Sequence, residues 1–330
     1  MFEIMRQPFH NGCMNDGMPD NKTLERLQAR VGKIHLRQRL GIERACERKV
    51  FGRGRTFFHI EHWYSLRKLI RYSLRFTLLY SHSQRNARRI LVRHNHVAIP
   101  GLPASFENYT LLQITDLHLD FAEDFPHVLS EAVRPLQYDA CVLTGDYRGE
   151  TYGPWDAVLA GLQRVRVHLQ GKVYGVLGNH DTICMVPGME DMGIRMLLNE
   201  QVALERGGAT IYLAGVDDPH YYRADNLEKA VEGIPENAVS ILLAHSPEIY
   251  RHAAHADFSL LLCGHTHAGQ ICLPGGTPLI CSANCPREYC AGAWDYHGMS
   301  GYTAAGSGAC IVDVRLNCPP EVTLHHLHCS

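Results

Sequence analysis

Five short polar motifs between Asp116 and His267 carry side chains that could bind metal ions. They are Asp116-Leu117-His118, Gly145-Asp146, Gly178-Asn179-His180-Asp181, the single His245, and Gly264-His265-Thr266-His267. Their side chains offer carboxylate and amide oxygens and imidazole nitrogens, without a thiolate. That set suits Mn²⁺, Fe or Zn²⁺ better than a sulfur-preferring metal.

These side chains are too many for one ion, so the sequence predicts two divalent ions bridged by a carboxylate. Mn²⁺ is favoured, with Fe or Zn²⁺ as alternatives. Such a pair, about 3.5–4 Å apart, holds both the attacking and the leaving oxygen of an in-line displacement at phosphorus, and it lowers the pKa of a bound water. The predicted chemistry is therefore hydrolysis of a phosphoester.

The elements that must position these motifs are apolar strands, because each motif directly follows one. Helical patterns at 124–136 and 154–170 separate some of the strands, which indicates an α/β fold with buried sheets. Side chains beyond the carboxyl ends of such strands gather at one edge of the sheet. Strands are predicted at 109–115, 138–144, 172–177, 209–214, 238–244, 257–263, 310–315 and 321–327.

The charge is divided unevenly along the 330 residues. The formal net charge is −2, yet residues 1–95 hold 20 Lys and Arg against 7 Asp and Glu, a net +13, and residues 96–330 hold a net −15. Pro100, Gly101 and Pro103 mark a boundary. We therefore predict a polar, flexible segment 1–22, a basic helical arm 23–95 and a catalytic body 96–330, and the arm indicates contact with an anionic surface.

One stripe of the arm is both apolar and flanked by cations. Arg67, Lys68, Arg71 and Arg75 lie between its members, as in helices that rest in a membrane interface. Packing on the body or in a dimer, and binding of nucleic acid, are the alternatives. The stripe consists of Trp63, Leu66, Ile70, Leu74 and Leu78, widened by Leu69 and Tyr72.

The sequence shows neither an apolar run of about 18 residues nor an apolar core typical of a secretory signal. We therefore expect a cytoplasmic protein, peripheral on the inner face of the cell membrane. The twelve cysteines include no CxxC pair and are expected to be free thiols, with zinc at Cys281, Cys285 and Cys290 as the weaker alternative. We expect no chemistry at five histidines outside the motifs. They are His94, His96, His325, His326 and His328.

The motifs, in this order, resemble those of the calcineurin-like metallophosphoesterases, and the resemblance covers roughly residues 108–330. The segments GHTHAGQICLP and NCPPEVTLHHL resemble a bacterial subgroup in which GHTHGGQ is usual, so Ala268 is a departure. The resemblance implies a four-layer sandwich of two mixed sheets flanked by helices.

The resemblance also implies a role for each matching residue. His180 would donate a hydrogen bond or a proton to the phosphate or the leaving group, and Asp181 would hold His180 in orientation. Arg148 would bind either the substrate phosphate or a surface carboxylate. The first ion would be bound by Asp116, His118 and His267, the second by Asn179, His245 and His265, and Asp146 would bridge the two.

A substrate that joins a phosphodiester or pyrophosphate to acyl chains would suit both the metal centre and the arm. Among similar enzymes, the UDP-2,3-diacylglucosamine pyrophosphohydrolases of lipid A synthesis act on one, releasing UMP and 2,3-diacylglucosamine 1-phosphate. The stripe would shelter the acyl chains while Arg67, Arg71 and Arg75 reach phosphate. The alternatives are a soluble phosphodiesterase of broad or nucleotide specificity, a nuclease, and a non-catalytic scaffold. Stacking aromatics near the motifs are not evident, which disfavours nucleic acid.

Overall fold

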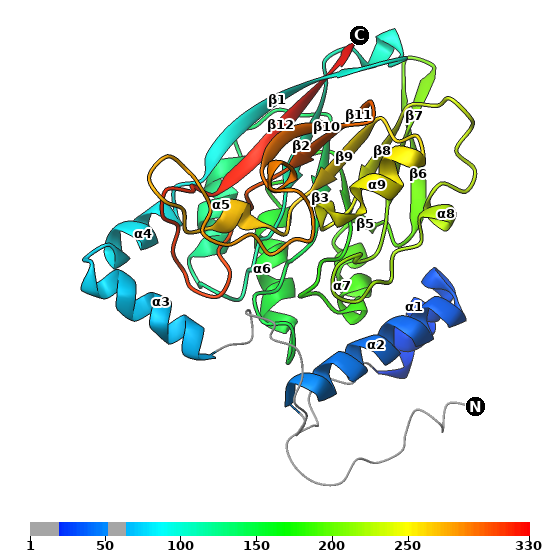
Figure 1. Cartoon of the computed structure of the whole chain (residues 1–330). Helices are drawn as coiled ribbons and strands as arrows, with labels where there is room; N and C mark the ends of the chain where they lie inside the picture. The colour runs from blue at the N-terminus through cyan, green and yellow to red at the C-terminus, as the bar shows by residue number, and fades with distance from the viewer. Residues whose placement is uncertain (1–19, 52–63) are drawn as a thin grey trace.

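Two mixed sheets of six strands each form the centre of the molecule (Figure 1). The computed structural model describes residues 20–51 and 64–330, so most of the segment 1–22 and Trp63 lie outside the described residues. The first sheet has the order β1-β12-β2-β3-β4-β5. Its strands are β1 (Leu91–Ile99), β2 (Tyr109–Ile114), β3 (Ala140–Leu143), β4 (Lys172–Gly175), β5 (Ile194–Met196) and β12 (Glu321–Cys329).

The second sheet has the order β10-β11-β9-β8-β7-β6. Neighbouring strands from β2 to β5 in the first sheet, and from β7 to β9 to β11 in the second, run parallel. Parallel strands place their carboxyl ends at one edge, as the motifs require. The strands are β6 (Glu200–Arg206), β7 (Ala209–Gly215), β8 (Ser240–Leu243), β9 (Leu260–Cys263), β10 (Gly292–Tyr296) and β11 (Met299–Thr303).

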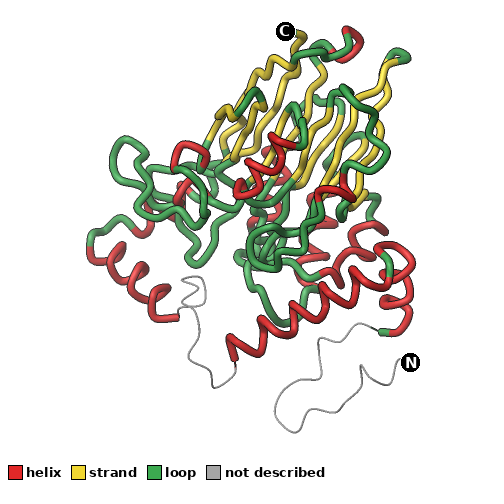
Figure 2. Tube along the Cα trace, turned by 45° about the vertical axis from the view of Figure 1, so that its right-hand side comes forward, coloured by secondary structure: helices red, strands yellow, loops and turns green. Residues whose placement is uncertain are grey.

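Helices lie against the outer faces of the sheets (Figure 2). Apolar side chains fill the space between the two sheets. Helices α5 (Phe125–Val133), α6 (Asp156–Arg166) and α7 (Val186–Asp191) cover the first sheet. Helices α8 (Leu227–Ala230) and α9 (Tyr250–His255) cover the second. The predicted sandwich of two mixed sheets flanked by helices is confirmed.

The arm is helical, as predicted, but it ends before residue 95, where its C-terminal boundary was predicted. Helices α1 (Asn21–Val31), α2 (Lys33–Phe51), α3 (Tyr64–Phe76) and α4 (Tyr80–Asn86) precede the first strand. The side chain of Asp20 caps α1 by accepting the backbone N–H of Thr23 at 2.7 Å. Strand β1 begins at Leu91 and pairs with β12 along its whole length. The boundary predicted at residue 95 therefore cuts a strand of the body.

The segment 310–315, predicted as a strand, is instead a loop. Val312 and Val314 are buried against Leu74 of α3, so their apolar character reflects contact with the arm. Arg315 is fully buried and donates hydrogen bonds to the carbonyls of Gly306 and Gly308. Packing on a helix, rather than pairing in a sheet, explains this apolar run.

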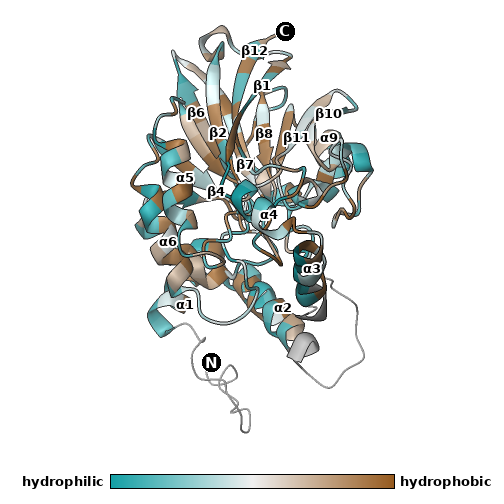
Figure 3. Cartoon of the chain, turned by 90° about the vertical axis from the view of Figure 1, so that its left-hand side faces the viewer, coloured by the Kyte–Doolittle hydropathy of each residue, from teal (hydrophilic) through white to brown (hydrophobic). Residues whose placement is uncertain are grey.

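Helix α3 mixes hydrophilic and hydrophobic residues (Figure 3), and the residues of the predicted stripe do not share one environment. Ile70 and Leu74 pack against the 311–316 loop. Leu69, Tyr72 and Phe76 are 62, 65 and 90% exposed. Leu78 lies beyond the end of the helix with a φ of 60°. Within the described residues, the helices are too short or too polar to cross a lipid bilayer.

Candidate metal centre

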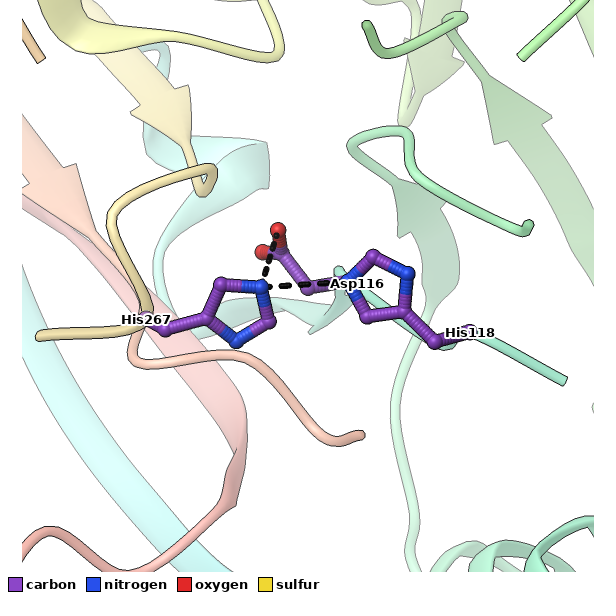
Figure 4. A group of neighbouring side chains, drawn as sticks. All are labelled: Asp116, His118 and His267. Atoms are coloured by element: carbon purple, nitrogen blue, oxygen red, sulfur yellow. Dashed lines mark hydrogen bonds and ion pairs between the residues drawn. The ribbon is translucent and has the colours of Figure 1, made fainter. Parts of the chain in front are cut away.

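The first group of candidate ligands joins the two sheets. Asp116 and His118 follow β2 of the first sheet, and His267 follows β9 of the second. The Nε2 of His267 lies 3.1 Å from the Nε2 of His118 and 3.4 Å from Asp116 Oδ1. Figure 4 shows the three side chains pointing toward one another. They match the predicted ligands of the first ion, since their ligand atoms all lie within 4.8 Å of one another.

The second group consists of Asp146, His245 and His265, whose ligand atoms satisfy the same distance limit. His245 Nε2 lies 3.2 Å from Asp146 Oδ2 and 2.9 Å from Asn179 Oδ1. His245 Nδ1 donates to the carbonyl of Thr144, which turns Nε2 toward the centre. The structure therefore brings the seven predicted ligands together, with Asp146 on the side of the second group.

The ligands are held by an unusual backbone conformation. Asp116, His118, Asp146, His265 and His267 all have a positive φ, between 45° and 71°. Residues other than glycine seldom adopt this left-handed region, and it costs on the order of 1–3 kcal/mol at each position. The turn after each strand thus directs the ligand side chain into the centre, and the packed sheets keep it there.

Two glycines, Gly178 and Gly264, have no side chain and so provide the space that the carboxylates of Asp146 and Asp116 occupy. A Cβ on Gly178 would collide with Asp146 Oδ1, and a Cβ on Gly264 would collide with Asp116 Oδ2. The cradle therefore admits only glycine at these positions unless a ligand moves. A donor set of carboxylate, amide and imidazole in such a cradle fits two divalent ions. When bound, these ions would polarise the phosphoryl oxygens of a substrate.

Buried charge sets the electrostatics of the centre. Burial acts to raise the pKa of Asp146, but the neighbouring His245 and His180 outweigh it and hold this pKa well below its usual range. Burial acts to lower the pKa of His245, but Asp146 raises it to about 10. His265 and His267 have a pKa well below the usual range because of burial. A cation at the second group must therefore displace the His245 proton.

His180 lies beside the candidate ligands. Its Nε2 lies 3.9 Å from Asp146 Oδ2, and its Nδ1 lies 2.8 Å from Thr151 Oγ1. The carboxylate of Asp181, expected to orient the His180 ring, accepts the backbone N–H groups of Gly178, Asp146, Tyr147 and Arg148. Asp181 thus holds the turn that carries the Asp146 carboxylate. Sequence reasoning missed Thr151, which belongs to no motif.

The predicted substrate contacts lie at different places around the centre. Arg148 is buried and donates from Nη2 to the carbonyl of Gly153, and its binding of substrate phosphate stays a prediction. Its own carbonyl accepts a hydrogen bond from His118 Nδ1. Arg67 forms an ion pair with Glu150 at 2.8 Å. Arg71 and Arg75 are exposed on α3, and Arg75 lies over the ring of Tyr80.

Two arginines outside the motifs support the centre. Arg315 Nη2 lies 3.0 Å from His267 Nδ1 and fixes that ring from behind. Arg39 of α2 is fully buried, donates to the carbonyl of Asp181 at 3.0 Å and pairs with Asp217 at 3.2 Å. Arg315 could have been noticed in the sequence, because it is an arginine within the otherwise mostly apolar run 310–315. Nothing in the sequence distinguishes Arg39 from the other basic residues of the arm.

Comparison with known proteins agrees with this geometry. Residues 109–269 match the family model of the calcineurin-like phosphoesterases. The chain is 28% identical over 237 residues to the uncharacterized metallophosphoesterase YkoQ of Bacillus subtilis, covering 69% of this chain and 86% of that protein. It is 26% identical over 255 residues to the phosphodiesterase YaeI of Escherichia coli, covering 72% and 87%.

A third relative is the transmembrane protein with metallophosphoesterase domain of Bos taurus, 30% identical over 249 residues. The match covers 69% of this chain but about half, 54%, of that protein. The family match begins at β2, includes all five motifs and ends just beyond His267. The chain therefore contains a calcineurin-like metallophosphoesterase domain, and its enzyme class is that of a metal-dependent phosphohydrolase.

Proposed function

We propose that this protein hydrolyses a phosphodiester or pyrophosphate bond, with two divalent ions at the centre, in a substrate presented at a membrane surface. The observation that supports this proposal is the proximity of the two groups of candidate ligands to His180, whose Nε2 lies 3.9 Å from Asp146 Oδ2. Mn²⁺ is the proposed ion, because oxygen and imidazole ligands suit it. The relative YaeI, named a phosphodiesterase, supports the reaction type.

The membrane part of the proposal rests on the outward face of α3, defined as Leu69, Tyr72 and Phe76. These residues follow one another at steps of three and four, so they share one side of the helix. Lys68, Arg71 and Arg75 are exposed next to them. Apolar side chains bordered by cations match an anionic lipid surface, and each cation near such a surface contributes about 1 kcal/mol.

Helix α3 also contacts the loop that orients His180. Arg67 pairs with Glu150, and the next residue, Thr151, contacts His180. This connection supports an acylated phosphate as the substrate, because a helix resting on lipid would lie next to the loop beside the metal centre. The most specific candidate is UDP-2,3-diacylglucosamine, cleaved to UMP and 2,3-diacylglucosamine 1-phosphate.

The reaction is tested with protein stripped by a chelator and reloaded with Mn²⁺. We expect hydrolysis of bis-p-nitrophenyl phosphate that disappears without metal, and release of UMP from UDP-2,3-diacylglucosamine in mixed micelles. Diester hydrolysis without UMP release would indicate a soluble phosphodiesterase instead. Inactivity toward both, at full metal occupancy, would contradict the proposed reaction and favour a scaffold.

The membrane surface is tested by sedimentation with vesicles containing phosphatidylglycerol. Leu69→Asp with Phe76→Asp should reduce vesicle binding at least tenfold, because it places carboxylates on the face that contacts lipid. Val167→Asp with Leu279→Asp, which alters exposed apolar residues elsewhere, is the matched control. Equal binding by the two variants would contradict the role of α3, while diester hydrolysis in solution should be unchanged in both.

A further inference from the structure

The candidate ligand His265 is held by a different ring nitrogen from two other imidazoles of the metal centre. His118 and His245 donate from Nδ1 to backbone carbonyls, which turns their Nε2 atoms toward the centre. His265 instead donates from Nε2 to the carbonyl of Ser282 at 3.3 Å. Burial holds the pKa of His265 well below its usual range, so the ring is neutral. With the proton on Nε2, Nδ1 is the nitrogen left for an ion.

The carbonyl that His265 contacts belongs to an irregular loop, residues 281–286, which we call the supporting loop. These residues belong to neither a helix nor a strand, so contacts of the loop itself fix the Ser282 carbonyl. The backbone N–H of Asn284 donates to Glu248 Oε1 at 2.6 Å. Glu248 lies on the short helix η5 (Pro247–Ile249), which closely follows His245. Its carboxylate therefore fastens the supporting loop next to the carbonyl that orients His265.

The same carboxylate oxygen also holds a second neighbour of His265. His220 Nδ1 lies 2.9 Å from Glu248 Oε1, and the His220 and His265 rings lie together with centroids 4.2 Å apart. Burial acts to raise the pKa of Glu248, but His220 outweighs it and this pKa is lowered, so Glu248 is a carboxylate. The His265 ring is thus confined at Nε2 by the supporting loop and on its face by His220. Both neighbours are held by Glu248.

We propose that Glu248 is a positioning residue for the second ion, because it holds both groups that confine the His265 ring and so sets how tightly that ion binds. The inference rests on the two-ion centre of the proposed function. The first group has other supports, the carbonyl of Arg148 and the guanidinium of Arg315, so the first ion should not depend on Glu248. Losing the partner that orients a metal-binding histidine weakens metal binding about 10–100-fold.

The test measures Mn²⁺ binding to the full-length, chelator-stripped protein rather than hydrolysis. Calorimetric titration gives the affinity of each ion, and electron paramagnetic resonance detects the coupled pair of Mn²⁺ ions. Glu248→Ala removes the carboxylate, whereas Glu248→Gln keeps an oxygen that can accept the Asn284 N–H. Glu288→Ala, which removes an exposed carboxylate just beyond the supporting loop, is the matched control. Circular dichroism verifies that each variant is folded.

We expect the wild type and Glu288→Ala to bind two Mn²⁺ ions and to show the coupled signal. Glu248→Ala should bind the first ion as tightly as the wild type and the second about 10–100-fold more weakly, and Glu248→Gln should lie between them. Unchanged binding of both ions by Glu248→Ala, or equal weakening of both, would overturn the inference. A wild type that binds fewer than two ions would contradict the two-ion centre itself, so the two failures are distinguishable.

Discussion

Residue by residue, the metal centre depends on side chains that no motif contains. The motifs supplied the seven candidate ligands, because each of them follows a strand whose apolar sequence is easily recognised. The groups that orient those ligands come from elsewhere: Thr151 contacts His180, and Arg315 contacts His267. Their effect depends on tertiary contact alone. The sequence gave no reason to select Thr151, and for Arg315 it offered only the presence of an arginine in an apolar run.

Thr151→Val tests the orientation of His180. Valine keeps the shape of threonine but removes the hydroxyl that contacts His180 Nδ1. One hydrogen bond is worth about 0.5–1.5 kcal/mol, so we expect kcat for a phosphodiester to fall about two- to tenfold at unchanged Mn²⁺ content. Thr151→Ser, which keeps the hydroxyl, should restore most of the rate. An unchanged kcat in the valine variant would mean that Thr151 does not position His180.

His325 makes folding sensitive to acid. It is fully buried, with Nε2 2.9 Å from Gln113 Oε1 and Nδ1 3.0 Å from Asn95 Nδ2, so the neutral ring is satisfied. Burial, followed by the neighbouring His326, lowers its pKa to about 3, below the usual 6.5. The unfolded chain therefore binds the extra proton between pH 6.5 and 3. Stability from this group is complete above pH 6.5 and is lost as the pH falls.

The loss should approach about 1.4 kcal/mol for each pH unit below 6.5. Urea unfolding of the metal-free protein between pH 7 and 5 measures it. His325→Gln should have a shallower pH dependence than the wild type, whereas His127→Gln, at an exposed position, should not. If the wild type and His325→Gln lost stability in parallel, the buried neutral ring would not be the cause.

Among the elements, the strands that precede motifs were predicted, as were β7 and β12, whereas the other strands were not. β2, β7 and β12 lie close to their predicted ranges because apolar residues recur along each of them. β1 was missed because only Val97 and Ile99 of its nine residues are well-buried apolar side chains, and its polar histidines resembled the arm. The loop 310–315 was mistaken for a strand because its valines face α3 rather than a sheet.

Helix α2 is a structural part of the body, which follows from Arg39. This fully buried guanidinium pairs with Asp217 at 3.2 Å and Glu43 at 2.8 Å, and lies over the ring of Tyr222. Arg39→Met would leave the Asp217 carboxylate buried without its main cation. Removing one partner of a buried pair costs about 3–5 kcal/mol, so the free energy of unfolding should fall by that amount in urea.

Two variants control this measurement. Arg37→Met, at an exposed position of the same helix, should change stability by less than about 0.5 kcal/mol. Asp217→Asn combined with Arg39→Met should recover part of the loss, because the uncompensated charge is then gone. A loss of similar size in the two single arginine variants would show that α2 is not anchored through Arg39.

At the scale of the whole molecule, the uneven charge is partly used within the chain. Arg26, Arg30, Arg67 and Arg88 of the arm each pair with an acidic residue of the body. The contrast between +13 and −15 therefore contributes to holding the arm on the body, in addition to any contact with lipid. The cations next to the outward face of α3 are the part of this charge that the membrane proposal uses.

The metal centre connects the two sheets, so bound ions should stabilise the whole molecule. Asp116, His118 and Asp146 follow strands of the first sheet, whereas His245, His265 and His267 follow strands of the second. A ligand that binds only the folded state at a concentration 100 times its Kd adds about 2.7 kcal/mol. We expect Mn²⁺ to raise the Tm of chelator-stripped protein by several degrees in differential scanning calorimetry.

Asp146→Asn should lose most of this increase, because the amide removes the negative charge that Asp146 brings to the candidate ligands. Asp295→Asn, which changes an exposed carboxylate, should retain the full increase. Both variants should unfold in a single transition, since the ligands of each group come from both sheets. If Mn²⁺ raised the Tm of Asp146→Asn as much as that of the wild type, the ion would bind elsewhere, and the connection between the sheets would not depend on metal.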